Sequence, residues 1–564
     1  MTLQRPALAA ALAALAACAS PPQSTPVAPP AAASPAAATS ALVPLRVLAI
    51  NDFHGNLKPP SGGLRMADPA RPGATIEVAA GGAEHLATAL ETLRAGQANH
   101  IFVAAGDLIG ATPLLSALLH DEPTIESLGL MGLEVSAVGN HEFDKGAAEL
   151  LRLQRGGCHP VDGCRGPRPW AGAAFQYLAA STVDKASGQT LLPPFVVKRF
   201  QGIPVAFIGL ALKGTPAIVV PAGVAGLRFD DEADTVNRLV PGLRAQGIEA
   251  IVLLIHEGGA TTGGINDCPD ISGRIVDIVR RLDPAVDLIV SGHTHRAYIC
   301  RIDGRLVTSG DKYGTLVTQI DLQLDTRSGD VASARAQNVV VRESFAKDAR
   351  QTALIETYER LVQPLARRVV GRVAAGFTRE ANAAGESTLG QLIADAQLEA
   401  TREAGARLAL TNPGGMRAPL PRPADGVLRY EDLFSVQPFA NNLVTLTLSG
   451  AQLLEVLEQQ WPAGGRQRVL QVSRGFTYQW DAARPQGQRI VPGSVVLDGK
   501  ALDPAAPYRV TVNAFLAEGG DGFTKLRRAS ERRTGVMDVD ALESWLRQRP
   551  GYGPGALDRI ARLN

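Results

Sequence analysis

The sequence lacks an excess of charge of either sign, with 56 Lys and Arg residues against 55 Asp and Glu and a formal net charge of +1. Binding to a nucleic-acid polymer needs a basic field, and none is present. The composition, 45% hydrophobic and 20% charged, is that of an ordinary folded protein. Because 564 residues exceed what one hydrophobic core usually holds, two domains are expected.

The N-terminal Ala/Leu run at residues 7–17 is too short to span a bilayer, but it has the length of a signal-peptide core and follows Arg5. It ends in Leu15-Ala16-Ala17-Cys18, which resembles the lipobox of bacterial lipoproteins, in which the cysteine is acylated. We therefore predict a lipoprotein signal peptide at residues 1–17 and lipidation of Cys18. A plain secretory signal is the alternative, and both readings predict export.

Residues 18–43 are almost entirely Ala, Pro, Ser and Thr, and such a segment cannot bury enough apolar surface to fold. We interpret it as a tether between a lipid anchor and the folded domains. Ala19 and Ser20 follow Cys18, where lipoproteins retained in the inner membrane carry Asp. The expected location is the outer membrane facing the periplasm, with the lipid as the only membrane contact and the protein a monomer.

Cysteine is scarce, with five in the whole chain. Export favours disulfides among the four that remain after Cys18. Cys158 and Cys164 lie in the Gly/Pro-rich loop GGCHPVDGC, and Cys268 and Cys300 bracket a segment that ends in GHTHRAYIC. We predict the pairs Cys158–Cys164 and Cys268–Cys300, against the alternative of four reduced thiols.

Between residues 44 and 342, apolar runs alternate with amphipathic segments, a pattern typical of an α/β layer structure. Residues 343–368 form a charged, amphipathic stretch without turn signals, which predicts a linker helix. Residues 369–564 show a second, smaller α/β pattern. The sequence contains no internal repeat.

Five apolar runs of the first domain end in polar side chains of the kind that bind metals. In chain order these side chains are Asp52 and His54, Asp107, Asn140 and His141, His256, and His293 and His295. Strands of an α/β sheet present ligands at their carboxyl ends, so these groups are expected to converge. The other four histidines, His85, His100, His120 and His159, are interpreted as ordinary loop residues.

Carboxylate, imidazole and amide ligands without thiolate favour Zn, Mn, Fe or Co over a structural cysteine site. Seven candidate ligands exceed the needs of one tetrahedral ion, whereas two ions bridged by Asp107 use them all. Such a pair can activate water and stabilise an in-line phosphoryl displacement. His141 and Asp144 remain as an imidazole–carboxylate pair that can act on the phosphoryl group or the leaving group.

The motifs NDFHG, GD, GNHEFD, a strand-end His followed by Gly-Gly, and GHTH resemble the calcineurin-like metallophosphoesterases in their 5′-nucleotidase and UDP-sugar hydrolase form. The resemblance implies a four-layer sandwich joined by the linker helix to a smaller substrate-binding domain. It implies two divalent metal ions, with Zn, Mn, Co and Mg as candidates. The implied ligands are Asp52, His54, Asp107 and His295 for the first ion and Asp107, Asn140, His256 and His293 for the second, with His141 and Asp144 as the catalytic dyad.

The second domain also matches this family, in TNPGGMR, VQPFANN and NAFLAEGGDGF. By resemblance, Phe439 and Phe515 stack on the nucleobase, Asp521 contacts the ribose, Asn412 helps to bind the base and Arg417 binds the phosphate. One position departs from the pattern: Gly385 stands where the family commonly has a phosphate-binding arginine, and Arg379 is the nearby candidate to replace it.

The expected function is hydrolysis of 5′-nucleotides, and of UDP-sugars as a further substrate class, to nucleoside and phosphate. Two enzymatic alternatives are a 2′,3′-cyclic-nucleotide 2′-phosphodiesterase/3′-nucleotidase and a thiosulfohydrolase of the same superfamily. A surface adhesin or nucleotide-binding lipoprotein with a vestigial site is the non-enzymatic alternative. Phe515 and Asp521 argue against the thiosulfohydrolase, and the complete set of strand-end ligands argues against a vestigial site.

Overall fold

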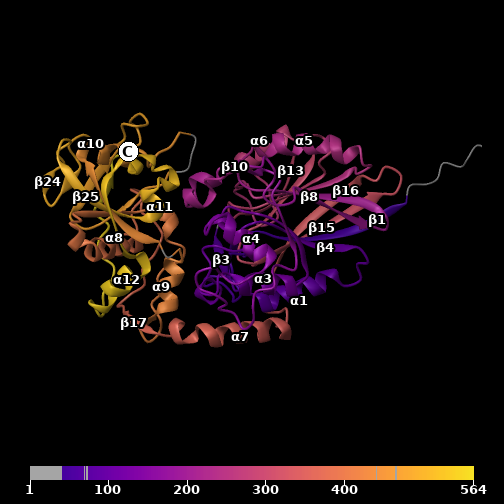
Figure 1. Cartoon of the computed structure of the whole chain (residues 1–564), viewed down its shortest axis with the longest axis horizontal. Coiled ribbons are helices and arrows are strands. Elements are labelled where there is room, and N and C mark those ends of the chain that lie inside the picture. The colour runs from indigo at the N-terminus through magenta and orange to yellow at the C-terminus, as the bar shows by residue number, and fades with distance from the viewer. Residues whose placement is uncertain (1–40, 69, 72–73, 440, 464–466) are drawn as a thin grey trace, which may run out of the picture. The chain divides into compact units, whose positions relative to one another are not determined.

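The computed structural model describes residues 41–68, 70–71, 74–439, 441–463 and 467–564 (Figure 1). The predicted signal peptide, Cys18 and most of the predicted tether lie outside these residues. Among the helices of the described part of the chain, none has both the length and the apolar character needed to cross a membrane.

The first sheet has six strands in the order β16-β15-β1-β4-β5-β6. Strands β1, β4, β5 and β6 run parallel, and β15 and β16 extend the sheet in antiparallel fashion. The strands are β1 (Leu42–Ile50), β4 (His100–Ala105), β5 (Leu133–Ala137), β6 (Gln176–Leu178), β15 (Leu316–Asp325) and β16 (Val331–Val340).

The second sheet also has six strands, in the order β13-β14-β12-β11-β9-β8. Its four inner strands are parallel and its two edge strands are antiparallel to their neighbours. The strands are β8 (Phe195–Phe200), β9 (Ile203–Leu210), β11 (Ala250–Ile255), β12 (Leu288–Ser291), β13 (Ala297–Ile302) and β14 (Arg305–Gly310). Two short ladders pair β2 (Leu64–Ala67) with β3 (Thr75–Val78) and β7 (Thr182–Asp184) with β10 (Leu227–Phe229).

Apolar residues on both faces of these strands explain why the two sheets pack against each other and are covered by helices. All six residues of β11, AIVLLI, are buried, as expected for a parallel strand covered on both sides. One core fills the space between the sheets, and two others lie beneath the outer helices. In Figure 1, α5 and α6 lie on one side of the strands and α1 and α3 on the other. This is the four-layer sandwich that the family resemblance implied.

The helices of this domain are α1 (Ala83–Arg94), α2 (Leu114–Ala117), α3 (Glu122–Leu130), α4 (Ala147–Arg155), α5 (Glu232–Arg244) and α6 (Arg274–Arg281). The short 3₁₀ helices of the described chain are η1 (His141–Phe143), η2 (Thr215–Ala217), η3 (Pro221–Val224), η4 (Arg402–Ala404), η5 (Pro413–Gly415), η6 (Gly520–Gly522) and η7 (Thr524–Arg528).

The linker helix α7 (Ala349–Ala366) begins later than the sequence analysis placed it. Asp348 is its N-cap, and its carboxylate accepts hydrogen bonds from the backbone N–H of Arg350 at 2.9 Å and of Gln351 at 3.0 Å. Such a cap starts a helix by satisfying amides that have no partner within it. Residues 343–348 therefore precede the helix, and its predicted start at residue 343 was wrong.

The second half of the chain contains a five-stranded sheet in the order β21-β18-β25-β20-β26 and a four-stranded sheet in the order β24-β23-β22-β27. Helix α8 (Thr388–Ala400) packs on β18 and β21, and its N-cap Ser387 accepts from the Gly390 amide. The other helices are α9 (Tyr430–Val436), α10 (Gly450–Glu458), α11 (Ala514–Ala517) and α12 (Asp538–Arg547).

The strands of this half are β17 (Val369–Arg372), β18 (Leu408–Thr411), β19 (Val427–Arg429), β20 (Asn442–Ser449), β21 (Gln471–Val472), β22 (Phe476–Trp480), β23 (Val496–Leu497), β24 (Lys500–Ala501), β25 (Pro507–Asn513), β26 (Ser530–Met537) and β27 (Ile560–Arg562). Strands β17 and β19 form a separate two-stranded pair.

Candidate active site

The predicted metal ligands follow strands of both six-stranded sheets. Those after β1, β4 and β5 come from the first sheet, and those after β11 and β12 come from the second. Five of the seven have a left-handed backbone: Asp52, His54, Asp107, His293 and His295 have φ between 46° and 70°. Residues other than glycine rarely adopt this conformation, and it concentrates at functional sites where the surrounding structure holds it in place.

Asp52, His54 and His295 form one group whose ligand atoms lie within 4.8 Å of one another. The Nε2 atoms of His54 and His295 are 3.1 Å apart, and His295 Nε2 is 3.2 Å from Asp52 Oδ1. His54 Nδ1 lies 2.8 Å from the carbonyl oxygen of Gly110, so this nitrogen carries the proton and Nε2 presents its lone pair to the group. Such convergence of lone pairs fits a cation.

Asp107, His256 and His293 form a second such group. Asp107 Oδ2 lies 2.9 Å from His256 Nε2 and 3.7 Å from His54 Nε2, so the same oxygen reaches both groups. Asn140 Oδ1 is buried without a hydrogen-bond partner among the described residues. Asn140 directly precedes His141, whose backbone N–H donates to Asp107 Oδ1 at 2.8 Å. An orphaned amide oxygen at this position fits a second divalent cation better than it fits a purely protein network.

The electrostatics of the two groups agree with cation binding. Burial alone would raise the pKa of Asp52, but the imidazoles of His295 and His256 outweigh it and lower that pKa to about 2. Burial lowers the pKa of His293 to about 4, with the charge of His256 adding to the effect. Burial opposes protonation of His256, yet the Asp107 carboxylate raises its pKa to about 10, so a bound cation would displace that proton.

His141 and Asp144 lie beside both groups. His141 Nδ1 is 2.7 Å from Asp144 Oδ2, and the backbone N–H of His141 donates to Asp107 Oδ1 at 2.8 Å. The ring of His141 is 5.0 Å from that of His54. Because Asp144 holds Nδ1 as the protonated nitrogen, Nε2 is the atom of His141 that is left for chemistry.

Two residues that support the ligands were given no role from the sequence. Glu142, a buried residue within GNHEFD, accepts hydrogen bonds from the backbone N–H groups of Asp107, Leu108 and Gly139 at 2.9, 2.8 and 2.6 Å. Asn51 donates to Asp52 Oδ2 at 2.8 Å and accepts from the Gly310 amide at 2.7 Å, which joins the ends of β1 and β14. Their place beside the predicted ligands was the only sequence signal.

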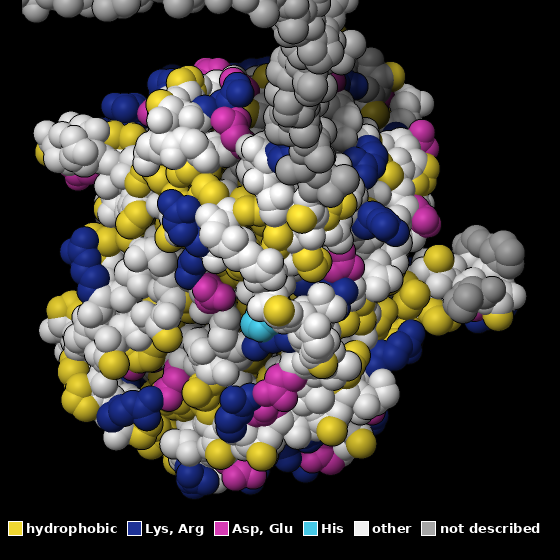
Figure 2. All heavy atoms as spheres, turned by 90° about the vertical axis from the view of Figure 1, so that its right-hand side faces the viewer, with side chains coloured by type: hydrophobic (Ala, Val, Ile, Leu, Met, Phe, Trp, Pro, Cys, Tyr) yellow, Lys and Arg dark blue, Asp and Glu magenta, His cyan; other side chains and the backbone are white. Residues whose placement is uncertain are grey.

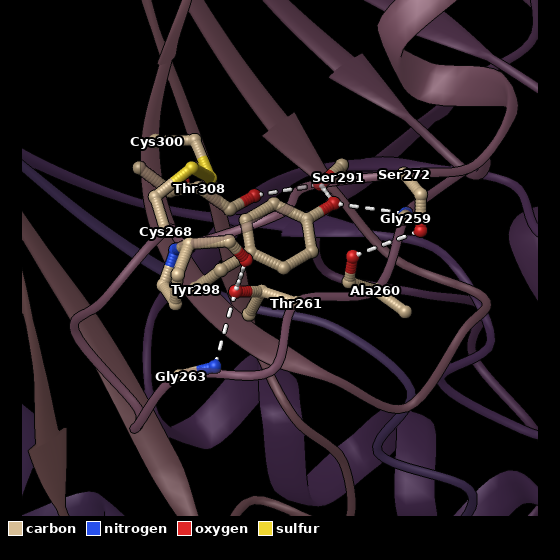
Figure 3. The surroundings of a disulfide bond; sticks show 11 residues. Gly259, Ala260, Thr261, Gly263, Cys268, Ser272, Ser291, Tyr298, Cys300 and Thr308 are labelled. Atoms are coloured by element: carbon tan, nitrogen blue, oxygen red, sulfur yellow. Dashed lines mark hydrogen bonds between the residues drawn. A yellow bond between two sulfur atoms is a disulfide. The ribbon is translucent and has the colours of Figure 1, made fainter.

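The predicted pair Cys268–Cys300 is a disulfide in the structure, with its Cα atoms 5.2 Å apart. Beside it, the Tyr298 hydroxyl accepts from the Gly259 amide at 3.2 Å and lies 2.7 Å from Ser291 Oγ (Figure 3). Gly259 follows His256 by three residues, and Ser291 precedes His293 by two. One buried hydroxyl therefore links the two segments that carry these ligands. The other predicted pair, Cys158–Cys164, is also a disulfide.

The predicted substrate residues of the second half fall into two groups. Asn412 Nδ2 donates to Asp521 Oδ2 at 2.6 Å, and Asn513 Nδ2 donates to Asn412 Oδ1 at 3.1 Å. Burial raises the pKa of the Asp521 carboxyl, and the nearby Arg468 partly offsets this. Phe515 lies against Gly520, where an added Cβ would come within 2.4 Å of the ring. This group is a hydrogen-bonded set of polar side chains with an aromatic ring beside it.

Arg417 and Phe439 form the other group and lie next to the strand-end ligands. Phe439 is stacked on His141, with the ring centroids 6.0 Å apart and an angle of 17° between the planes. The Arg417 guanidinium carbon is 5.9 Å from the Phe439 ring centre, and Nη2 is buried without a hydrogen-bond partner among the described residues. An anion beside His141 would provide that partner.

Among the described residues, the rings of Phe439 and Phe515 are not in contact with each other. Gly385 has φ +93°, and a Cβ there would come within 2.6 Å of Val469. Any other residue at this position would be strained and would clash with Val469. Arg379 donates from Nη1 to the backbone carbonyl oxygen of Arg417 at 2.8 Å.

Gly139 gives a test of the cluster, because a Cβ at this position would lie 2.1 Å from Asp107 Oδ1. We expect Gly139→Ala to displace Asp107 and to lower metal retention after dialysis by about 10-fold or more. Elemental analysis of the purified chain measures this. Gly226→Ala is the matched control, since a Cβ there meets nothing within 4 Å. Equal metal content in the two variants would contradict the expectation.

Comparison with known proteins agrees with this geometry. Residues 45–297 match the family described as calcineurin-like phosphoesterase, and residues 369–528 match the 5′-nucleotidase, C-terminal domain. The cell wall protein Lmo0130 of Listeria monocytogenes is 32% identical over 556 residues, covering 92% of this chain and 68% of that protein. Endonuclease YhcR of Bacillus subtilis is 32% identical over 477 residues, covering 84% of this chain but only 37% of YhcR.

Among solved structures, the 5′-nucleotidase precursor from Thermus thermophilus superposes with a TM-score of 0.75 at 27% identity, covering 92% of this chain and 99% of that one. Both halves of the chain are thus accounted for, and in the order that the sequence predicted. The chain belongs to the 5′-nucleotidase family of metal-dependent phosphoric ester hydrolases, in which a calcineurin-like phosphoesterase domain precedes a 5′-nucleotidase C-terminal domain.

Proposed function

We propose that the protein is an exported 5′-nucleotidase that hydrolyses nucleoside 5′-phosphates to nucleoside and phosphate. UDP-sugars are a further proposed substrate class, cleaved first to UMP and sugar 1-phosphate, after which UMP gives uridine and phosphate. The observation that carries the proposal is the position of Arg417 and Phe439, which belong to the C-terminal half but lie beside His141 and the strand-end ligands. A substrate that carries both a phosphate and an aromatic base matches a site in which a guanidinium and an aromatic ring lie beside the same cluster.

In this proposal Asp52, His54, Asp107 and His295 hold one divalent cation, and Asp107, Asn140, His256 and His293 hold the other. Two such ions supply Lewis-acid activation of water and neutralisation of phosphoryl charge. The chain itself holds the substrate: Arg417 binds the phosphate and neutralises part of its charge. His141, with Nδ1 fixed by Asp144, directs Nε2 at the phosphoryl group or the leaving oxygen and stabilises the charge that develops there.

The nucleoside is assigned to Phe439, Phe515, Asn412 and Asp521. Stacking on an aromatic ring contributes about 1 to 3 kcal/mol per base. The Asp521 carboxylate, set in place by Asn412, is an acceptor for ribose hydroxyls. In this assignment each of the two phenylalanine rings stacks on one face of the base.

A mononucleotide is a better match than a nucleic-acid polymer. The net charge of +1 supplies no basic field, and the face drawn in Figure 2 has Lys and Arg side chains interspersed with Asp and Glu. The two disulfides support an oxidising location. The lipid anchor on Cys18, outer-membrane attachment, the monomeric state, and division of the chain at residues 44–342, 343–368 and 369–564 remain part of the proposal.

Phosphate release from a substrate panel tests the function. After chelation and addition of Mn, Co, Zn or Mg, we expect release from AMP, and from UDP-glucose if the UDP-sugar assignment holds. Release from 3′-AMP and 2′,3′-cyclic AMP without AMP hydrolysis would instead identify the cyclic phosphodiesterase. Cleavage of single-stranded DNA in place of AMP would identify an endonuclease, as the name of YhcR suggests for that relative.

His141→Ala tests the proposed catalytic role. Loss of the imidazole should lower turnover of AMP by about 10²- to 10⁴-fold. Metal content should stay at the wild-type level, because His141 is not among the proposed ligands. His85→Ala is a comparison outside the cluster, since His85 Nδ1 contacts the carbonyl of Phe345. Undiminished turnover in His141→Ala would refute the assigned role.

Asp521→Ala tests the nucleoside-binding role. Loss of a charge-assisted hydrogen bond costs about 1.5 to 3 kcal/mol, so KM for AMP should rise by roughly 10- to 100-fold. Hydrolysis of p-nitrophenyl phosphate, which has no ribose, should be unaffected. Asp558→Ala, at an exposed position, should leave both substrates unaffected. Equal effects of Asp521→Ala on the two substrates would show that Asp521 does not contact the nucleoside.

A further inference from the structure

A second cluster of potential metal ligands lies outside the candidate active site. His120, Glu149 and His159 each offer a ligand atom, and these atoms lie within 4.8 Å of one another. The three come from separate segments: His120 follows α2, Glu149 is on α4, and His159 lies in the loop closed by the Cys158–Cys164 disulfide. From the sequence, both histidines were interpreted as ordinary loop residues, and the structure shows that they meet.

Asp162, from the same disulfide-closed loop, adds a fourth group. Its Oδ2 lies 2.9 Å from His120 Nε2 and 3.7 Å from His159 Nδ1. Within the described chain, His120 Nε2 is nevertheless buried without a hydrogen-bond partner. A buried imidazole nitrogen that faces a carboxylate without a hydrogen bond is left to be satisfied by something else.

The four side chains are held in place by their surroundings. The two imidazole rings are stacked with centroids 3.9 Å apart. The Nδ1 lone pair of His159 accepts from the backbone N–H of Asp162 at 3.1 Å, a hydrogen bond that a cation bound at this nitrogen would replace. Arg152 donates to both oxygens of Glu149, at 2.9 and 2.8 Å, which leaves each oxygen a further lone pair. The disulfide spans only six residues and limits how far His159 and Asp162 can move apart.

The charged side chains in and around the cluster carry a net negative charge, which favours binding of a cation. Four carboxylates lie in or next to it, those of Asp121, Glu122, Glu149 and Asp162. Three cationic side chains pair with them, those of Lys145, Arg152 and Arg165. The carboxylates therefore exceed the cationic side chains by one charge when both histidines are neutral. This excess negative charge would stabilise a divalent cation bound by the neutral imidazoles.

We propose that His120, Glu149, His159 and Asp162 bind a divalent cation of the zinc type at a site separate from the strand-end cluster. Two imidazoles and two carboxylates are a complete tetrahedral set for zinc, which leaves no open position for substrate. The ion is therefore structural. It fastens the disulfide-closed loop to α4, the helix that begins three residues after Asp144. Lys145, two residues before this helix, pairs with Asp121 at 3.1 Å.

Zinc stoichiometry of the full-length chain tests the proposal. Wild-type protein is equilibrated with Zn²⁺, freed of loosely bound metal by gel filtration, and analysed for zinc per chain. We expect His159→Gln to contain one equivalent less than wild type. The matched control is His100→Gln, which removes an exposed histidine from outside both clusters and should keep the wild-type content. Equal zinc content in His159→Gln and wild type would overturn the proposal.

Phosphate release and circular dichroism report whether the variant has folded, since His159 has no place in the proposed catalytic machinery. If His159→Gln does not fold, Asp162→Asn decides the outcome, because this side chain lies on the exposed part of the loop. Its zinc dissociation constant at the site, from competition with a chromophoric chelator, should rise at least about 10-fold. An unchanged dissociation constant would overturn the proposal.

Discussion

The structure of the first domain is constrained by the free-energy cost of burying the carboxylates and imidazoles of the candidate metal site. Asp52, His54 and His256 have no exposed surface, and Asp107 has 1%. Buried carboxylates and imidazoles at such density are unfavourable unless a positive charge is shared among them. The left-handed backbone at five ligands, the Glu142 carboxylate that holds three amides and the Asn51 bridge all serve to keep these groups in place. Together they form a preorganised frame for cations.

The candidate metal ligands lie where the two sheets meet, and the packing of the sheets explains how this cluster can be rigid. The strands that deliver Asp52 and Asp107 are hydrogen-bonded neighbours in the first sheet, and those that deliver His256 and His293 are neighbours in the second. Asp107 Oδ2 contacts His256 across the seam, so a shift of one sheet against the other would break the cluster. The apolar core between the sheets opposes such a shift.

Much of this was readable from the sequence because strand ends follow a simple rule. Apolar runs that stop at Asp52, Asp107 or His256 predict both a strand and a candidate metal ligand at its end, and the linker helix and second domain follow from helical and turn patterns. Three features were not readable. That the ligands come from two sheets depends on strand order, the start of α7 depends on the Asp348 cap, and the meeting of His120 with His159 joins loops 39 residues apart without a shared pattern.

The glycine at position 385, where the family commonly has an arginine, is explained by local backbone geometry. With φ +93° and Val469 within 2.6 Å of any Cβ, the turn at Gly385 cannot accept an arginine without rebuilding. Arg379, six residues earlier, instead donates to the backbone of Arg417 at 2.8 Å. This bond places the Arg379 guanidinium at the backbone of the residue assigned to the phosphate, and replacement of the family arginine by Arg379 stays a prediction.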